Sequence, residues 1–466
     1  MDTSIERGNW VNNIFHKCFT SFHFNKQKNK MTEILLTIFF ISVLLFFLGS
    51  GIWVALSMIG VSAIGMMLFT SRPVGDAMAT TIWGTSSSWT LTALPLFVWM
   101  GEILFRTKLS ENLFKGLSPW MQKLPGGLIH VNIVGCALFA AISGSSAATV
   151  ATVGKMSIPE LRKRKYPEKI LLGSLAGSGT LGLLIPPSII LIIYGVAVQE
   201  SIAKLFIAGI IPGIMIALIF MSYVIIWSLI NKKIMPKILE EYSFIDKIKR
   251  SKQLLPVIIL ILAVIGSIYT GIATATEAAS LGVLGALILS YFQKSLTVET
   301  FKSSLLGATK TSCMIAFILA GSTFLSLAMG FTGLPRNLAL WIQNMELSPY
   351  VLIFVLMLFY IILGMFLDGI SAVVLTMAII EPMIRQAGFD MIWFGIFLVI
   401  VVEMAQITPP VGFNLFVLQG MSKKDMGYID KSAFPLFLLM VLAVILVVIF
   451  PEIALWMPEQ MIKNIN

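Results

Sequence analysis

Polar residues interrupt apolar runs at two places in the sequence, and their side chains are of the kinds that bind small cations. The first place is Ser143-Gly144-Ser145-Ser146, and the second is Asp368-Gly369. Hydroxyl and backbone carbonyl oxygens suit Na⁺ when they are presented inside a membrane protein. A carboxylate in an apolar segment is costly and usually functional, which makes Asp368 the most informative ionisable residue. Asp368 could bind a cation directly or cap a helix that begins at Gly369, and both interpretations stay open.

Each polar interruption is followed by a proline pair, at Pro186-Pro187 and at Pro409-Pro410. Proline lacks an N–H and clashes with the carbonyl four residues earlier, so each pair should break a helix and free carbonyl oxygens. A broken helix also presents a negative C-terminal end and a positive N-terminal end at one depth. The freed carbonyls suit Na⁺ and the N-terminal ends suit a carboxylate. The sequence therefore predicts sites for a cation and an organic anion in the middle of the membrane.

The elements that must position these residues are membrane helices. Hydrophobic residues make up 57% of the 466 residues and charged residues only 12%, about half the charged share of a soluble domain. Many apolar runs approach the roughly 20 residues that a spanning helix needs. We expect an all-α polytopic protein with about ten to twelve transmembrane helices and two re-entrant helical hairpins. Continuous rather than alternating apolar runs exclude a β-barrel.

Charge, cysteine and histidine usage narrow the class of protein. The net charge of +10 is concentrated in short segments, Lys232–Lys252 and Arg162–Lys165, which the positive-inside rule places in the cytoplasm; nucleic-acid binding is not indicated. The three cysteines show no CxxC spacing, and only one histidine lies beyond the first thirty residues. We therefore expect no disulfide framework, no metal centre other than Na⁺ sites, no cofactor and no enzymatic activity.

A shift of 223 residues aligns the two halves of the chain without a gap. Pro186 and Pro187 fall on Pro409 and Pro410, and Arg162 falls on Arg385. Residues 1–30 form an N-terminal extension of no assigned function, 31–230 a first repeat, 231–253 a basic cytoplasmic linker and 254–466 a second repeat. The first copy has a cationic polar turn and the second does not, so the two copies should have opposite orientations in the membrane.

Each repeat is expected to contain a hairpin and a broken helix. The first repeat has its hairpin at about 128–160, with arms near Leu128–Ile142 and Ala147–Met156, and its broken helix at about 170–198. The second has them at about 350–384 and 391–420. Non-helical backbone is tolerated at membrane depth only where it is buried in protein or lines a wet cavity. Plain helix packing by Ser, Gly and Ala remains an alternative for the first polar stretch.

Five motifs together resemble one family of transporters. They are "SGSSAATVATVGKMSIPEL", "GSGTLGLLIPPSIILIIYG", "GIATATEAAS", "MFLDGISAVVL" and "ITPPVGFNLFVLQG". From about Met31 onward the chain is similar to the large membrane subunit of tripartite ATP-independent periplasmic (TRAP) transporters. The resemblance implies a multi-pass protein of the bacterial inner membrane that imports small organic acids with Na⁺ by an elevator movement. It also implies two partners, a separate small four-helix membrane subunit and a periplasmic substrate-binding protein.

The resemblance also assigns residues. One cation site would use the first hairpin tip and the first break, and the other would use the second tip and the second break. The implied Na⁺-binding residues are Ser143, Gly144, Ser145, Ser146, Gly179, Ile185, Asp368, Gly369, Thr408, Val411 and Gly412. The implied substrate-binding residues are Thr149, Ser188, Ser371 and Asn414.

Two other functions would require different features. A stand-alone Na⁺/organic anion symporter of similar elevator architecture would need no binding protein. A membrane enzyme would need a catalytic constellation, and the sequence has neither clustered histidines or cysteines nor a nucleophile elbow. The sequence does not name the organic acid, which could be a C4-dicarboxylate, sialic acid or another sugar or 2-oxo acid.

Overall fold

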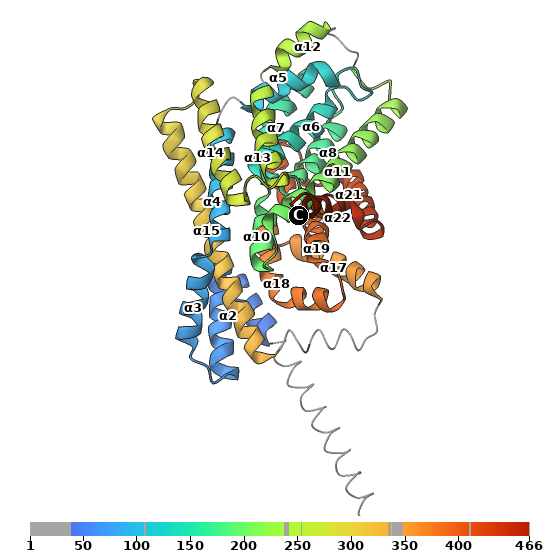
Figure 1. The fold of residues 1–466 in the computed structure, drawn as a ribbon. Helices are drawn as coiled ribbons and strands as arrows, with labels where there is room; N and C mark the ends of the chain where they lie inside the picture. The colour runs from blue at the N-terminus through green and yellow to red at the C-terminus, as the bar shows by residue number, and fades with distance from the viewer. Residues whose placement is uncertain are drawn as a thin grey trace, which may run out of the picture.

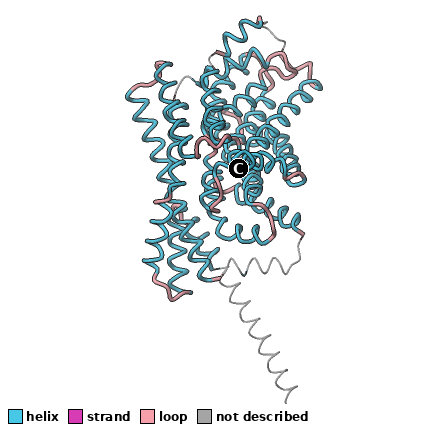
Figure 2. Tube along the Cα trace, viewed as in Figure 1, coloured by secondary structure: helices cyan, strands magenta, loops and turns pink. Residues whose placement is uncertain are grey.

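The computed structural model describes residues 39–106, 109–236, 242–252, 254–333, 337, 348–409 and 412–465. Within these ranges the chain is helical throughout and contains no strand (Figure 2). The all-α membrane fold expected from the sequence is thus confirmed. The extension 1–30 and Val411 lie outside the described residues.

The elements follow one another in a simple order (Figure 1). An apolar helix over Phe39–Gly49 comes first. After it come α2 (Val54–Phe69), α3 (Val74–Ser86), η1 (Trp89–Thr92), α4 (Ala93–Phe105), α5 (Leu109–Met121), α6 (Ile129–Ser143), α7 (Ser146–Lys163), α8 (Glu168–Gly179), α9 (Leu181–Leu184), α10 (Ile189–Ala197), α11 (Ile202–Ile230), α12 (Phe244–Ser251), α13 (Leu255–Tyr269), α14 (Ala275–Phe292), α15 (Val298–Thr332), α17 (Pro349–Gly364), α18 (Gly369–Gln386), α19 (Met391–Ala405), α20 (Phe413–Ser422), α21 (Met426–Ile449) and α22 (Glu452–Ile465).

Several of the described helices can cross a bilayer. Five are long and apolar enough alone, namely α11, α14, α15, α18 and α21, and the number rises to as many as eight if each of three bent pairs forms one span. Five shorter apolar helices accompany them within the described ranges. The protein is therefore a multi-pass membrane protein, while the count of ten to twelve crossings stays a prediction.

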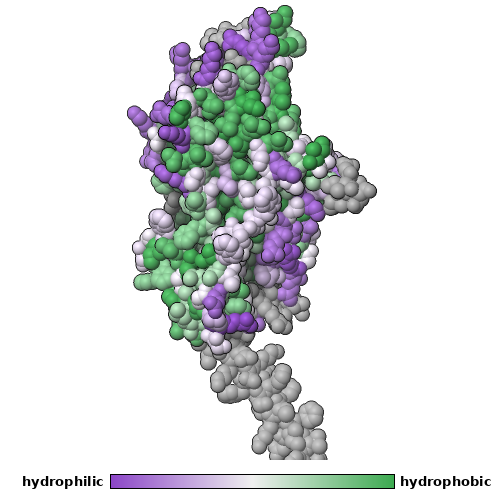
Figure 3. Space-filling view, turned by 60° about the vertical axis from the view of Figure 1, so that its left-hand side comes forward, coloured by the Kyte–Doolittle hydropathy of each residue, from purple (hydrophilic) through white to green (hydrophobic). Residues whose placement is uncertain are grey.

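The two helices that carry the breaks lie at the centre of the fold. All fifteen residues of α19 are buried, and so is α8 from Ile170 to Gly179. A helix that is apolar all round belongs inside the protein rather than at its edge. Outer helices instead expose large apolar side chains, such as Leu262 on α13 (65% exposed) and Leu284 on α14 (56%), as expected of a surface in contact with lipid. Figure 3 shows broad hydrophobic areas on one such face.

A group of long helices flanks this centre. Helix α15 packs against α2, α3 and α4, and α14 packs against α4; Figure 1 shows them as one column of the molecule. Helix α4 also contacts α6 and α10, and α15 contacts α18. The column therefore meets the hairpins and the broken helices along one side.

Candidate functional site

The first polar interruption forms the turn between α6 and α7. Helix α6 ends at Ser143 and is followed by Gly144, which has φ 56°, a left-handed conformation that glycine adopts without a steric penalty. Ser145 then caps α7, because its hydroxyl accepts a bond from the Ala148 N–H at 3.5 Å. The Thr149 hydroxyl donates to the Ser145 carbonyl at 2.8 Å and lies 2.9 Å from the Ser143 hydroxyl. The serines and Thr149 thus hold the turn through their own hydrogen bonds.

Helix α7 is longer than the sequence suggested. It continues to Lys163, beyond the expected end of the second arm at Met156, because the polar stretch that follows faces partly outward and still favours helix. Helix α6 has 15 residues and α7 has 18.

The first proline pair interrupts the helical structure between α9 and α10. Helix α9 ends at Leu184, α10 begins at Ile189, and the helices on either side are bent by 42°. Ser188 caps α10 by accepting from the Leu191 N–H at 3.4 Å, and its hydroxyl also donates to the Leu183 carbonyl. The Ser188 side chain thereby satisfies backbone groups at both ends of the break.

The first hairpin tip lies directly against this break. A Cβ atom on Gly144 would lie 3.0 Å from the Pro187 carbonyl oxygen, and one on Gly182 would lie 2.6 Å from the Cα of Ser146. Backbone therefore meets backbone at both contacts, and glycine is required for that approach.

The second polar interruption forms a comparable turn between α17 and α18. Asp368 caps α18, accepting from the Ser371 N–H at 3.1 Å. A Cβ on Gly369 would lie 2.9 Å from Val402 on α19 and 3.5 Å from Ile190 on α10. The structure thus shows the capping role of Asp368 and places its turn against both broken helices.

The second break separates α19 from α20. The Thr408 hydroxyl donates to the Met404 carbonyl at 2.8 Å, and the Asn414 N–H donates to the Gln406 carbonyl at 3.1 Å. Gly412 is the residue before α20 and has φ 19° and ψ 88°. Pro410 and Val411 are outside the described residues, so only the flanks of this break are characterised.

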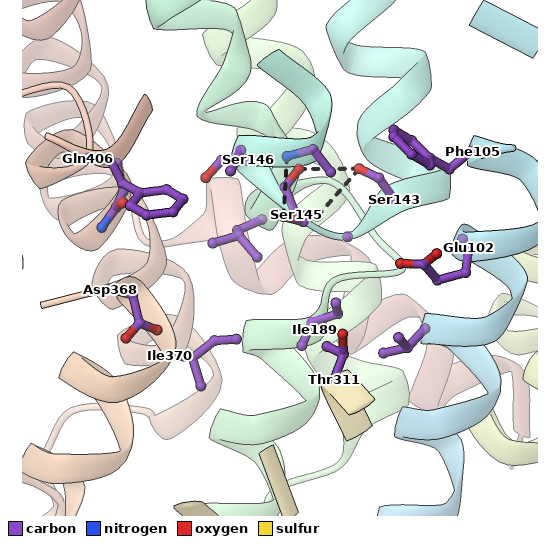
Figure 4. A pocket seen from close by; sticks show the side chains of 18 of the residues that line it. Glu102, Phe105, Ser143, Ser145, Ser146, Ile189, Thr311, Asp368, Ile370 and Gln406 are labelled. Atoms are coloured by element: carbon purple, nitrogen blue, oxygen red, sulfur yellow. Dashed lines mark hydrogen bonds between the residues drawn. The ribbon is translucent and has the colours of Figure 1, made fainter. Parts of the chain in front are cut away.

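A cavity of about 320 Å³ joins the two hairpin tips (Figure 4). Six of the predicted cation-binding residues line it: Ser143, Gly144, Ser145, Ser146, Asp368 and Gly369. Its remaining walls come from the two breaks, from α4 and from α15. The structure thus brings together both polar interruptions, which lie more than 220 residues apart in the sequence.

Four helices begin at this cavity. Ser146 starts α7, Ile189 starts α10, Gly369 starts α18 and Phe413 starts α20, and all four residues line the cavity. The N-terminus of a helix carries a partial positive charge and outward-pointing N–H groups. Four such ends around one space create a favourable environment for an anion.

The cavity also contains two carboxylates. Asp368 lies at the second tip, and Glu102 lies across the cavity on α4, as Figure 4 shows. Glu102 pairs with Arg106 at 2.7 Å. The cavity therefore offers oxygen ligands for a cation near the helix ends that favour an anion.

Sequence reasoning missed Glu102, Thr311 and Gln406, which all line the cavity. Glu102 could have been found, because it is a carboxylate in an apolar run, "VWMGEILF", the criterion that singled out Asp368. Thr311 on α15 and Gln406 after α19 carry no comparable signal in the sequence.

The other predicted site residues that the structure describes lie behind the cavity wall rather than on it. Thr149, Ser188 and Asn414 are fully buried and Ser371 is 2% exposed, and the first two stabilise the tip and the break through the bonds described above. The Ile185 side chain contacts Gly213 on α11, and Gly179 packs against Val150. Thr408 and Gly412 sit in the second break, where a Cβ on Gly412 would lie 2.8 Å from the Thr408 carbonyl oxygen.

Three buried polar side chains near the second break have atoms without a hydrogen-bond partner in the described part of the chain. They are both carboxylate oxygens of Glu403, Nδ2 and Oδ1 of Asn414, and Nε2 of Gln406. Glu403 is 1% exposed and lies beside the Ser146 hydroxyl at the first tip. Buried polar groups are normally satisfied, so these atoms are available to bind water or a ligand, as are others elsewhere in the described chain, such as Asn132 Oδ1 and Ser157 Oγ. No group of three or more His, Cys, Asp or Glu side chains forms a metal site in the described ranges.

The combination of broken helices, paired hairpin tips and a cavity with helix N-termini defines a membrane transporter. Residues 39–453 match the family model of the tripartite ATP-independent periplasmic transporter, DctM component. The chain belongs to this family, which is a transporter permease family rather than a family of enzymes.

Curated relatives are similar in sequence to this chain over most of its length. The C4-dicarboxylate TRAP transporter large permease protein DctM of Pseudomonas aeruginosa is 31% identical over 399 residues, which cover 85% of this chain and 92% of the relative. The sialic acid TRAP transporter large permease protein SiaM of Vibrio cholerae is 30% identical, covering 88% and 95%. The isethionate TRAP transporter permease protein DctMQ of Oleidesulfovibrio alaskensis is 30% identical, covering 88% of this chain and 64% of the relative.

A solved structure supports the fold. The YdaH transporter of Alcanivorax borkumensis superimposes with a TM-score of 0.61, covering 90% of this chain and 98% of that chain at 11% identity. At that identity the similarity concerns the arrangement of the helices alone.

Proposed function

We propose that this chain is the large membrane subunit of a Na⁺-coupled importer of small organic acids in the bacterial inner membrane. The observation that carries the proposal is the cavity in which four helix N-termini meet two carboxylates and a cluster of hydroxyls. The N-terminal ends would stabilise the carboxylate of the substrate. Hydroxyl, carbonyl and carboxylate oxygens would hold Na⁺ beside it.

The cation sites are assigned to the two tips and their breaks. The first would use Ser143–Ser146 with the carbonyls freed at the first break, and the second would use Asp368 and Gly369 with Thr408–Gly412. The unpartnered Oδ1 of Asn414 supports a cation site at the second break, because an amide oxygen is a suitable ligand for Na⁺. The unpartnered Nε2 of Gln406 is a hydrogen-bond donor and suits the anion instead. A cation and an anion bound side by side would neutralise each other's charge. This matters in the membrane interior, where burying either ion alone is unfavourable.

The substrate is assigned only by class. The cavity of about 320 Å³ lies at the lower end of the range for small-molecule sites, which fits an acid of a few carbon atoms. The relatives named above are described as transporters of C4-dicarboxylate, sialic acid and isethionate, and all three substrates are organic anions.

Two partners complete the proposal, a small four-helix membrane subunit and a periplasmic substrate-binding protein. The family is tripartite by its description, and a relative named DctMQ is longer than this chain. We propose that alternating access follows an elevator movement of the hairpins and broken helices against the column of α4, α14 and α15.

Uptake into proteoliposomes tests the proposal. The chain would be reconstituted with and without the small subunit and the binding protein, and the accumulation of radiolabelled C4-dicarboxylates, sialic acid and isethionate would be measured under an inward Na⁺ gradient. We expect accumulation only when all three components and Na⁺ are present. Strong uptake by this chain alone would instead support the stand-alone Na⁺/organic anion symporter.

A further inference from the structure

Helix α12, in the basic segment between the two halves of the chain, is strongly amphipathic. At about 100° per residue, its three large apolar side chains fall within one arc of roughly 100°. They are Phe244, Ile245 and Ile248, and they are 65%, 63% and 47% exposed. Such side chains would ordinarily be buried, and within the described residues Trp120 on α5 covers only part of this face, so a further partner for it must be sought.

Cations surround the same arc. Lys247, Lys249, Arg250 and Lys252 lie on or directly after α12, with Asp246 as the single carboxylate. Lys247 and Lys249 flank the apolar side chains on opposite sides of the helix. Apolar side chains bordered by lysines are typical of helices that lie in the membrane–water interface, where the long cationic side chains reach the headgroups.

The orientation of α12 agrees with this placement. Helix α12 lies at 60° to α13, the apolar helix that follows it, and Figure 1 shows it at one end of the molecule beyond the spanning helices. If α13 crosses the bilayer, α12 therefore lies closer to the plane of the membrane than to its normal. The concentration of cations places this end on the cytoplasmic side.

One side of α12 is attached to α5. The Trp120 indole N–H of α5 donates to the Ser251 hydroxyl at 2.7 Å, the Lys247 Nζ lies 5.4 Å from the Trp120 ring centroid, and the Phe244 ring packs edge-on against Trp120 at 6.2 Å. Helix α5 in turn contacts α6 and α7, the two arms of the first hairpin. A partner that fixes the position of α12 would therefore also fix α5, and α5 contacts the first hairpin.

We propose that α12 is an interfacial anchor for anionic lipid. It inserts Phe244, Ile245 and Ile248 below the headgroups of the cytoplasmic leaflet, binds anionic headgroups through its lysine and arginine side chains, and keeps α5 at the membrane surface through Trp120. Charge complementarity selects the lipid, because four cations and one carboxylate favour an anionic over a zwitterionic surface.

The test places a fluorescent label on Ile245→Cys in a chain whose Cys18 and Cys313 are replaced by serine. The full-length protein is reconstituted in mixed phosphatidylcholine and phosphatidylglycerol vesicles in which one lipid at a time carries brominated acyl chains, which quench a nearby label. We expect stronger quenching by brominated phosphatidylglycerol than by brominated phosphatidylcholine at equal mole fraction. High salt should reduce the difference, because headgroup attraction at the surface is screened.

Matched variants separate charge from insertion. Lys249→Gln with Lys252→Gln should lower the preference for phosphatidylglycerol by a factor on the order of 10, whereas the equal charge change Lys302→Gln with Lys310→Gln on α15 should leave it unchanged. If the α12 variant does not fold, the salt dependence of the lipid preference in the chain with unsubstituted lysines tests the contribution of charge instead. Equal quenching by both lipids at low salt overturns the proposal, as does a label that is unquenched in vesicles but becomes shielded when the small membrane subunit is added.

Discussion

Ser145 and Asp368 cap the second arms of the two hairpins through the same bond. Each side chain accepts from the backbone N–H three residues later, Ser145 from Ala148 and Asp368 from Ser371. The 223-residue shift places Ser145 on Asp368. One position is neutral and the other is charged, so the two tips share their local geometry but differ in the charge that they bring to the cavity.

Substitution of Asp368 should separate capping from charge. Asparagine caps a helix about as well as aspartate, whereas alanine does not. We expect Asp368→Asn to leave the unfolding free energy nearly unchanged and Asp368→Ala to lower it by about 1 kcal/mol. Both variants should weaken the Na⁺ dependence of uptake. If Asp368→Asn retained the Na⁺ dependence of the natural protein, the carboxylate would be a cap alone.

The hydroxyls at the first tip and the second break can be tested in the same assay. Ser145→Ala and Thr408→Ala should each raise the Na⁺ concentration needed for half-maximal uptake while the amount of protein in the membrane stays constant. Uptake and membrane abundance would be measured on the same vesicles. An unchanged Na⁺ response in both variants would show that the cation sites lie elsewhere.

Gly144→Ala should disturb the first tip by two effects. A non-glycine residue in the left-handed region costs about 1–2 kcal/mol, and the added Cβ would lie 3.0 Å from the Pro187 carbonyl oxygen. We expect lower thermal stability and a loss of uptake. Gly388→Ala is the matched control, because Gly388 has φ 80° and no atom within 4 Å of the added Cβ. A comparable loss of uptake in the control would mean that backbone strain alone explains the effect.

Glu403→Gln should stabilise the Na⁺-free protein and reduce the further stabilisation that Na⁺ provides. Neither oxygen of the buried carboxylate makes a hydrogen bond of normal geometry, although the Ser146 hydroxyl lies beside it, and an incompletely satisfied buried carboxyl group is destabilising. In Na⁺-free buffer we expect the unfolding free energy of the variant to exceed that of the natural protein by about 1–3 kcal/mol. Its unfolding temperature should be higher accordingly. The stabilisation that added Na⁺ provides should shrink. Equal Na⁺-dependent shifts in both proteins would exclude Glu403 from cation binding.

The orientation of the basic segments can be checked by cysteine labelling. With Cys18 and Cys313 replaced by serine, Lys163→Cys and Lys247→Cys should react only with a membrane-permeant reagent in intact cells. Gln386→Cys, at the polar turn of the second half, should react with an impermeant reagent. Labelling of all three from the same side would contradict the inverted arrangement of the halves.

The sequence predicted the membrane class, the helical fold and the polar tips, because these depend on local features. Apolar runs of sufficient length, a glycine at a turn and a serine or aspartate at a helix start each have a direct physical cause within a few residues. The turn at Gly144 was therefore predicted, and a cap by Asp368 was one of two interpretations of that residue; the cap by Ser145 was not predicted, because the second arm was expected to begin near Ala147.

The composition of the cavity wall was harder to predict. Thr311 and Gln406 line the cavity because α15 and the end of α19 pack beside the tips, and this depends on contacts between segments that are distant in the sequence. The same packing buries Thr149 and Ser188, whose hydroxyls bond to neighbouring backbone. A hydroxyl next to a predicted site can be either a ligand or a support, and only the three-dimensional arrangement distinguishes the two.

The contact between Gly182 and Ser146 also limits how substrate preference can change. Backbone atoms of the tip and the break are in close contact there, so side-chain replacement cannot widen the space between these two segments without separating them. Val98 and Phe105 on α4 and Phe413 at the start of α20 line the cavity with large apolar side chains. A redesign toward larger acids should therefore begin with these large side chains.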